Sequence, residues 1–189
     1  MKVAISGHMN LPADAIGTLR DRLHDYLSEA QKKYRNIRGI TCLAPGADQL
    51  FAEVCFELNI PYKVILPCAD YSTIISDDDQ RKAYFSALER ASYMQRQNYQ
   101  EGSGMAYWDA SQKMIIEADL LIAIWNEEAA KGHGGTADVV KLAQDADKPV
   151  IILNPDKKEE IQEESKRSIW DILGTLPFPK MHEDDNESF

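Results

Sequence analysis

Short apolar runs alternate along this chain with longer amphipathic segments, and this alternation restricts its fold more than any other feature. The runs are Lys2–Ser6, Gly39–Ala44, Pro61–Leu66, Leu120–Trp125 and Pro149–Leu153. They lack the polar-apolar alternation of a strand with one face in water, so each is expected to be a strand covered on both faces. The sequence therefore predicts an α/β fold of the Rossmann-like kind, with a doubly wound, mostly parallel sheet and helices on both faces.

The segments between these runs supply the helices of that fold. Leu19, Leu23 and Leu27, for example, recur at the spacing of one helix face. A short strand is expected at Ser92–Arg96, and the run Asp77–Asp79 is expected to cap a helix rather than to hold a cation. The predicted helices are Pro12–Lys33, Ala47–Leu58, Asp79–Arg90, Met105–Glu117, Thr136–Asp145 and Glu159–Leu173.

Length and charge limit the classes of protein to which the chain can belong. Its 189 residues suffice for one core, so we expect a single domain over residues 1–175 and an acidic, disordered tail over residues 176–189. The net charge of −10 argues against nucleic acid as a partner. No run approaches the ~20 apolar residues of a membrane-spanning helix, and the start does not read as a signal peptide. A cytoplasmic location is expected.

Cysteine and histidine are too sparse and too scattered for a metal site. Cys42, Cys55 and Cys68 form no C-x-x-C pair, and the chain has 4 histidines. The loop after the first strand also lacks the G-x-G-x-x-G pattern by which dinucleotide cofactors are bound. We therefore expect neither a bound metal nor a cofactor.

The clearest binding signal follows the strand Leu120–Trp125. Gly134, Gly135 and Thr136 come before an amphipathic segment and are expected to open a helix. The first N–H groups of a helix have no partner within it, and its dipole is positive at that end. Glycine adds no Cβ that would keep a ligand away from the backbone. The sequence therefore predicts a binding site for an anion such as phosphate.

Other candidate ligand contacts follow the first strand and the strand before the glycines. Gly7 and His8 come after the first strand, and Trp125 and Asn126 end the other. His8 either donates a hydrogen bond to phosphate or ribose or is an exposed loop residue. Trp125 either stacks on a base or packs the edge of the sheet, and Asn126 either binds a ligand or caps the loop. The carboxyl ends of parallel strands meet at one edge of a sheet, so these residues are expected to lie together.

The helix after the second strand contributes a third loop. Gly46 leaves room for phosphate, and Asp48 either accepts hydrogen bonds from a sugar or base or compensates the dipole of the helix. Glu53 lies further along the same helix. It is either a catalytic carboxylate or an ordinary residue of the helix surface.

Two phrases resemble motifs of the SLOG superfamily, a Rossmann-like group that includes the lonely-guy phosphoribohydrolases and DNA-processing protein A. Leu43–Asp48, LAPGAD, is similar to the LA-x-G-x-D of the DNA-processing branch, and Lys131–Thr136, KGHGGT, resembles the phosphoribohydrolase motif PGGxGT. That motif continues to a glutamate, whose place is taken here by Val139. Asp138 is one position early, which turns its side chain by ~100° around the helix. The resemblance implies a nucleotide site without its usual catalytic carboxylate.

Binding of a nucleotide or nucleotide-derived small molecule, as in a sensor domain, is the leading hypothesis. The alternative is an N-glycosidic hydrolase or transferase that acts on nucleoside monophosphates, with Asp138, Glu53 or Asp48 as its acid. A role in handling DNA follows from the resemblance but is opposed by the net charge of −10. A homodimer is expected from the general frequency of two-fold assemblies.

Overall fold

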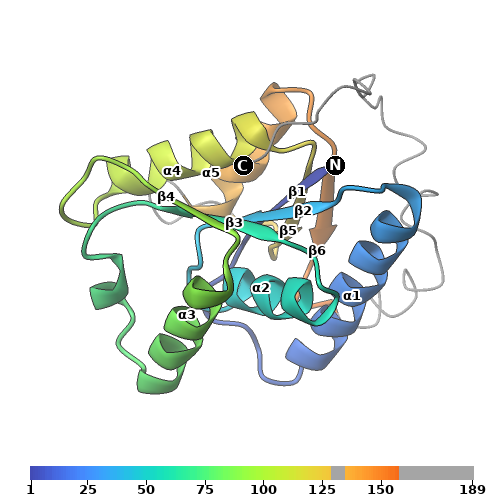
Figure 1. Cartoon of the computed structure of the whole chain (residues 1–189), viewed down its shortest axis with the longest axis horizontal. Coiled ribbons are helices and arrows are strands. Elements are labelled where there is room, and N and C mark those ends of the chain that lie inside the picture. The colour runs from blue at the N-terminus through green and yellow to red at the C-terminus, as the bar shows by residue number, and fades with distance from the viewer. Residues whose placement is uncertain (129–134, 158–189) are drawn as a thin grey trace.

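One parallel sheet organises the protein, whose structure is a computed structural model that describes residues 1–128 and 135–157 (Figure 1). In this part of the chain the sheet has six strands in the order β4-β3-β2-β1-β5-β6. The expected strands are all present, including the short fourth one. Their bounds are Lys2–Gly7 (β1), Arg38–Thr41 (β2), Tyr62–Leu66 (β3), Tyr93–Arg96 (β4), Leu120–Ile124 (β5) and Val150–Leu153 (β6).

The helices cover both faces of this sheet, with α1, α2 and α3 on one face and α4 and α5 on the other (Figure 1). The expected doubly wound α/β fold is therefore confirmed. None of the helices in the described residues is both long and apolar enough to cross a bilayer. The helix expected at 159–173 and the tail at 176–189 lie outside the described residues. The bounds are Ile16–Lys33 (α1), Ala47–Glu57 (α2), Tyr71–Ile74 (η1, a 3-10 helix), Asp78–Arg90 (α3), Gly104–Glu117 (α4) and Thr136–Asp145 (α5).

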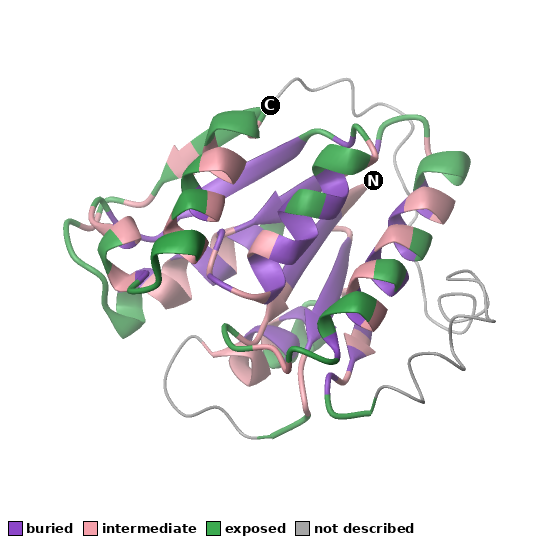
Figure 2. Cartoon of the chain, turned by 90° about the horizontal axis from the view of Figure 1, so that it is seen from below, coloured by how far each residue is buried: buried purple, intermediate pink, exposed green. Residues whose placement is uncertain are grey.

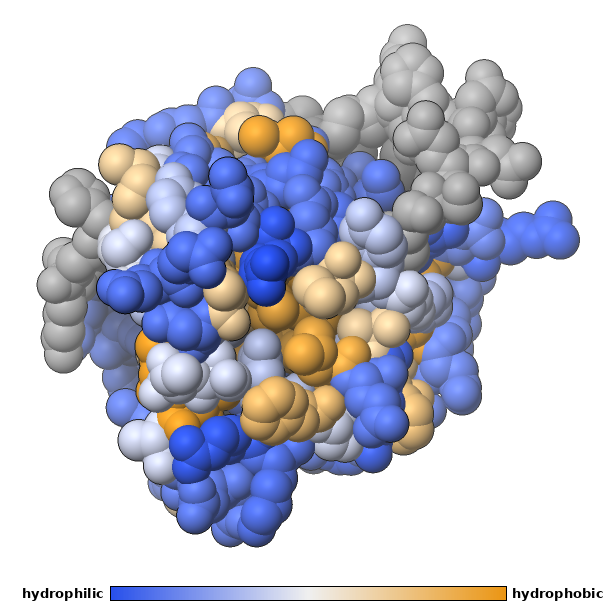
Figure 3. Space-filling model, turned by 60° about the vertical axis from the view of Figure 1, so that its left-hand side comes forward, coloured by the Kyte–Doolittle hydropathy of each residue, from blue (hydrophilic) through white to orange (hydrophobic). Residues whose placement is uncertain are grey.

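The strands are buried on both faces because successive side chains point to opposite sides of a sheet. Val3 and Ile5 of β1 belong to the apolar cluster under α1, α2 and α3, while Ala4 belongs to the cluster under α4 and α5. β5 divides its side chains in the same way. Figure 2 shows the buried strands behind α1, α2 and α3, whose outer sides are exposed. This arrangement explains why the strand sequences are apolar at nearly every position. In the space-filling view of Figure 3 most of the surface is hydrophilic, with a group of apolar side chains near the middle.

The order of the strands reverses beside β1. From β1 the chain adds β2, β3 and β4 on one side, and then crosses to place β5 and β6 on the other. β1 and β5 pair from Val3 with Leu120 to Gly7 with Ile124. The His8 N–H continues this ladder by donating to the Ile124 carbonyl at 3.0 Å. Ligands of such sheets bind at the carboxyl ends of the two strands where the order reverses, here β1 and β5.

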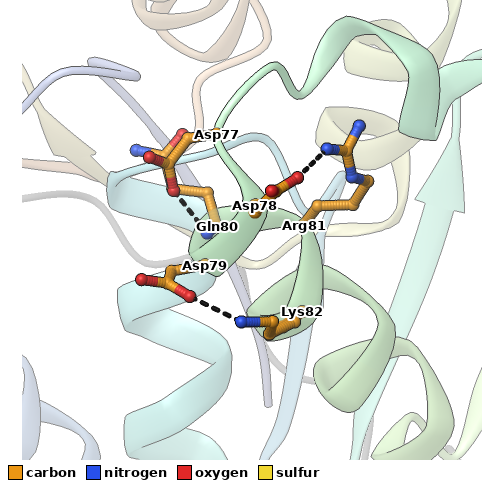
Figure 4. Close-up of polar contacts among 6 residues, drawn as sticks. All are labelled: Asp77, Asp78, Asp79, Gln80, Arg81 and Lys82. Carbon is orange, nitrogen blue, oxygen red and sulfur yellow. Dashed lines mark hydrogen bonds and ion pairs between the residues drawn. The ribbon is translucent and has the colours of Figure 1, made fainter.

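The acidic run before α3 caps that helix, as the sequence predicts. Asp77 is the N-cap residue, and its carboxylate accepts a hydrogen bond from the Gln80 N–H at 2.8 Å. Asp78 and Asp79 each form an ion pair with the basic side chain three residues further on (Figure 4). A carboxylate cap of this kind stabilises a helix by ~1 kcal/mol. The three carboxylates thus serve α3 separately and do not converge on a cation.

Candidate ligand-binding crevice

A cavity of about 780 Å³ opens at the carboxyl ends of the strands, beside the boundary between β1 and β5. The residues after β1, the loop between β2 and α2, and η1 form part of its wall. The inner turns of α4, the end of β5 and the start of α5 complete it. Its volume lies in the range of small-molecule sites. We call this cavity the crevice.

The start of α5 opens into the crevice without a side-chain cap. Gly135 is the N-cap residue, and no side chain within residues 1–128 and 135–157 accepts a hydrogen bond there. Thr136 and Ala137, the first two helical residues, line the crevice. Because the first N–H groups of a helix lack partners within it, those of Thr136 and Ala137 are available to an anion. Gly134, the other glycine of the expected anion site, lies outside the described residues.

His8 and Asn126 join the loops on the two sides of the reversal point. The Asn126 N–H donates to Nε2 of His8 at 3.0 Å, and Oδ1 of Asn126 lies 2.9 Å from the same nitrogen. The Glu128 N–H donates to Asn126 Oδ1 at 3.3 Å. Both His8 and Asn126 line the crevice. Their first role is to hold the two loops together, and their contact with a ligand stays a prediction.

Trp125 packs against the sheet, and its stacking on a base stays a prediction. It is half-buried, packs against the apolar cluster under α4 and α5, and also lines the crevice. Its Nε1 donates to the Glu128 carbonyl at 2.9 Å, which fixes the plane of the indole. An indole held in this way offers apolar surface to a ligand.

Asp48 holds the loop between β2 and α2. Its Oδ2 accepts hydrogen bonds from the Thr41 hydroxyl at 3.0 Å and from the Cys42 N–H at 2.9 Å. Burial raises the pKa of Asp48 to about 6, and these hydrogen bonds offset part of the rise. The residue touches the crevice but is only 4% exposed. The Asp48 carboxylate therefore stabilises the loop between β2 and α2, and its contact with a ligand stays a prediction.

Gly7 and Gly46 lie where another segment of the chain comes so close that a Cβ would not fit. A Cβ on Gly7 would lie 2.4 Å from the Ala47 Cβ and 2.7 Å from the Ile124 carbonyl oxygen. Gly46 has a φ of +78°, and its Cβ would lie 2.4 Å from the His8 carbonyl oxygen. Gly7 lines the crevice, whereas Gly46 lines a separate cavity. The space expected for phosphate at Gly46 is filled by the loop after β1.

Replacement of Gly46 by alanine is expected to lower the free energy of unfolding by about 2 kcal/mol, because strain at a glycine-only φ adds to the contact with the loop after β1. Gly17→Ala is a matched control. Gly17 lies in α1, where a Cβ would meet nothing within 4 Å, so alanine should stabilise by up to about 1 kcal/mol. Urea unfolding measures both changes. Wild-type stability in Gly46→Ala would contradict the close approach.

The structure places neither of the named catalytic candidates on the wall of the crevice. Val139 is buried in the core beneath α4 and α5, and Asp138, next to it, is not among the residues that line the crevice. Glu53 is exposed on α2 and lines the separate cavity between α2 and α3. The loops of the crevice therefore come together without these two carboxylates, and their catalytic role stays a prediction.

Tyr71, Tyr107 and Ser111 line the crevice, although the sequence did not single them out. The rings of Tyr71 and Tyr107 lie 6.2 Å apart at 60°. Burial, with nearby acidic groups adding, raises the pKa of Tyr71 well above its usual value, so its hydroxyl keeps its proton. One signal in the sequence was Tyr71, an aromatic residue within the otherwise polar segment 67–78. Cys42 also lines this wall, and burial, with the charge of Asp48 adding, raises the pKa of its thiol well above its usual value.

The described wall of the crevice carries acidic side chains but neither lysine nor arginine. Asp48, Glu128 and Asp156 line it, together with the imidazole of His8. On this described part of the wall, an anion would bind mainly through N–H groups, hydroxyls and the dipole of α5. Within residues 1–128 and 135–157, no three His, Cys, Asp or Glu side chains are grouped so as to hold a metal ion.

Comparisons with known proteins give matches in structure alone. No family model and no curated protein matches the sequence. DNA processing protein A from Streptococcus pneumoniae aligns over 94% of this chain and 62% of its own, at 11% identity and a TM-score of 0.62. The same protein from Helicobacter pylori, in a study of its single-stranded DNA binding mode, aligns over 93% and 79%, at 16% identity and 0.62. The structural-genomics target TM1055 aligns over 79% and 71%, at 18% identity and 0.50.

The parallel sheet, its helices on both faces and the crevice at the reversal point define a Rossmann-like α/β domain. Within that class, the chain shares its fold with the two structures of DNA processing protein A. The likeness concerns the fold alone, since identities are 11% and 16% for the two DNA processing proteins. The chain spans 62% of the length of the Streptococcus protein.

Proposed function

We propose that the crevice binds a nucleotide or a nucleotide-derived small molecule, with a phosphate at the start of α5. One observation carries this proposal: the uncapped start of α5, at Gly135 and Thr136, opens into a cavity of about 780 Å³ at the reversal point of the sheet. Backbone N–H groups and the helix dipole favour an anion there. The hydroxyl of Thr136 supplies a further hydrogen-bond donor.

The other walls of the crevice suit the remainder of a nucleotide. Trp125, Tyr71 and Tyr107 line it with aromatic surface, which packs well against a nucleobase. Ser111 and Asn10 add side chains that hydrogen-bond to a sugar or to the edge of a base. A cavity of this size holds one nucleotide with room for ordered water.

A small molecule fits the charges of the crevice better than single-stranded DNA does. DNA binding relies on Lys and Arg that neutralise phosphates. The described wall has neither, and the whole chain carries a net charge of −10. The Helicobacter protein binds single-stranded DNA, but the shared fold does not carry that activity to this chain.

The positions of the candidate acids favour binding without turnover, as in a sensor domain. Of the three candidate acids, only Asp48 lies on the wall of the crevice, and its Oδ2 already accepts two hydrogen bonds. Val139 takes the position of the missing glutamate and is buried. Hydrolysis of an N-glycosidic bond needs an acid or a nucleophile beside the sugar, and neither Asp138 nor Glu53 lines the crevice.

Calorimetry with mono-, di- and cyclic nucleotides, ADP-ribose and a single-stranded oligonucleotide tests the proposal. At least one small ligand should bind, and Thr136→Val should weaken that binding about 3- to 10-fold through loss of one hydrogen bond. Thr73→Val is the matched control, because Thr73 is exposed and does not line the crevice. Preference for the oligonucleotide, or no binding at all, would overturn the proposal. Release of free base, lost in Asp48→Asn, would favour the hydrolase instead.

A further inference from the structure

A second cavity, of about 330 Å³, lies between α2 and α3. Met9 and Asn10 line both this cavity and the crevice, so the loop after β1 is the wall between them. Gly46 and Glu53, which the sequence assigned to a ligand site, line this second cavity and not the crevice. We call it the α2–α3 cavity. Neither of these two residues is used by the proposed function.

Polar groups of both helices line the α2–α3 cavity without partners. Glu53 of α2 and Arg90 of α3 have no ion-pair partner among the described residues, although both line the same cavity. The Arg90 guanidinium instead stacks on the ring of Phe56, with its carbon 4.1 Å from the ring centre. Nε2 of Gln49, which also lines the cavity, is shielded from solvent and has no hydrogen-bond partner in the part of the chain that the structure describes. A buried donor without an acceptor is costly, so this arrangement favours a ligand that supplies one.

Apolar side chains form much of the remaining wall, together with the neutral polar side chains of Asn10, Gln80 and Ser86. Leu50 of α2, Tyr62 of β3, and Ala83 and Ala87 of α3 line it. The Tyr62 hydroxyl donates to the Ala87 carbonyl, which leaves the ring as apolar surface. The cavity thus presents one carboxylate, one guanidinium, several neutral polar groups, of which the Gln49 amide lacks a partner among the described residues, and an apolar patch. A ligand that fits should carry both a positive and a negative group and an apolar side chain.

We propose that the α2–α3 cavity binds a small zwitterion, an apolar amino acid or dipeptide. Its ammonium group binds the Glu53 carboxylate, and its carboxylate binds the Arg90 guanidinium. A carboxylate or peptide carbonyl oxygen accepts the hydrogen bond of Gln49 Nε2. The apolar side chain packs on Leu50 and Tyr62.

Other classes of ligand leave one of these groups opposed or unused. A nucleotide phosphate would bring negative charge towards Glu53, and like charges repel. A simple amine would leave Arg90 without a counter-charge, and a simple carboxylic acid would do the same for Glu53. A cavity of about 330 Å³ is at the small end of ligand sites, which suits a molecule of one or two residues. The inference does not rest on the proposed function of the crevice.

Calorimetry on the whole chain with leucine and leucyl-leucine tests this inference. At least one of the two should bind, and the blocked analogues N-acetylleucine and leucinamide should bind at least about tenfold more weakly, because each lacks one of the charges. Glu53→Gln and Arg90→Gln should each weaken binding of the zwitterion by a similar factor. Circular dichroism confirms that each variant is folded.

Matched controls lie on the same two helices. Glu57→Gln changes an acid on α2 that pairs with Arg20, and Arg81→Gln changes a base on α3 that pairs with Asp78; neither Glu57 nor Arg81 lines the cavity. Both controls should bind the zwitterion as the wild type does. No binding of either zwitterion, equal binding of the blocked analogues, or equal losses in the control variants would each overturn the inference.

Discussion

Replacement of Glu117 by glutamine should lower the free energy of unfolding by about 3 kcal/mol, because the Lys63 ammonium would stay buried without its counter-charge. Lys63 is 5% exposed, and its Nζ lies 2.9 Å from each carboxylate oxygen of Glu117. The ring of Tyr93, 5.2 Å from the ammonium, compensates only a small part of the lost charge. Urea unfolding at neutral pH measures the change.

Two further variants separate a buried ion pair from an ordinary surface one. Lys63→Met combined with Glu117→Gln should be more stable than Glu117→Gln alone, because the double variant leaves no buried charge. Asp145→Asn breaks the exposed pair with Lys141 and should cost less than about 1 kcal/mol. If Glu117→Gln lowered the free energy of unfolding by no more than Asp145→Asn does, the importance of the buried Lys63–Glu117 pair would be contradicted.

The pH dependence of this pair has a definite sign. Burial alone raises the pKa of Glu117, but the hydrogen bonds and charges of Lys63 and Lys113 outweigh it and lower the pKa below its usual 4.5. A carboxyl group with a lowered folded-state pKa stabilises the protein above its unfolded pKa. The stabilisation is lost as the pH falls through the lowered value. The difference between wild type and Glu117→Gln should therefore shrink in acid.

The fold was predictable because hydrophobic spacing reports burial directly. The run Pro61–Leu66 indicates a strand with both faces covered, and Val64 and Ile65 do belong to the clusters on opposite faces. Lys63, in the middle of that run, contradicts the pattern. Its partner Glu117 lies 54 residues later, on α4. No local pattern identifies such a pair, because it depends on how β3 and α4 pack.

The sequence predicted those residues of the crevice whose position follows from the order and direction of the strands. The carboxyl ends of parallel strands lie at one edge, so Gly7, Trp125, Asn126 and Thr136 were expected together, and all four line the crevice. The position of Glu53 depends on helix phase instead. Five residues after Asp48, it is turned by about 140° around α2.

Backbone pairing between loops was not predictable from composition. Residues 98–104 are polar and rich in glycine, which is typical of a mobile loop. In the structure, the Ala69 N–H donates to the Tyr99 carbonyl at 3.0 Å, and the Asp70 N–H donates to the Gln100 carbonyl at 3.2 Å. These bonds tie the loop after β4 to the loop after β3. They use backbone groups that every residue has, so they leave no signature in the side chains.

Wild-type protein should lose roughly 3 kcal/mol of stability relative to Asp48→Asn as the pH rises from about 4 to 7. Burial raises the pKa of Asp48 from 3.8 to about 6. An acid whose pKa is raised by folding binds its proton more tightly in the folded state. Below the unfolded pKa the carboxyl group is protonated in both states and folding carries no penalty. Through the window from 3.8 to about 6, ionisation favours the unfolded chain.

Urea unfolding of both proteins at intervals across this range measures the difference, and pH effects common to both cancel. Asparagine keeps one acceptor oxygen for the Thr41 hydroxyl and the Cys42 N–H, and the loss of the backbone hydrogen bonds of Leu43 and Ala44 to the carboxylate is a cost that does not vary with pH. If the wild type instead became more stable relative to Asp48→Asn as the pH rises, the hydrogen bonds to Asp48 would lower its pKa by more than burial raises it. The loop would then hold the carboxylate ionised, and the raised pKa of Asp48 would be wrong.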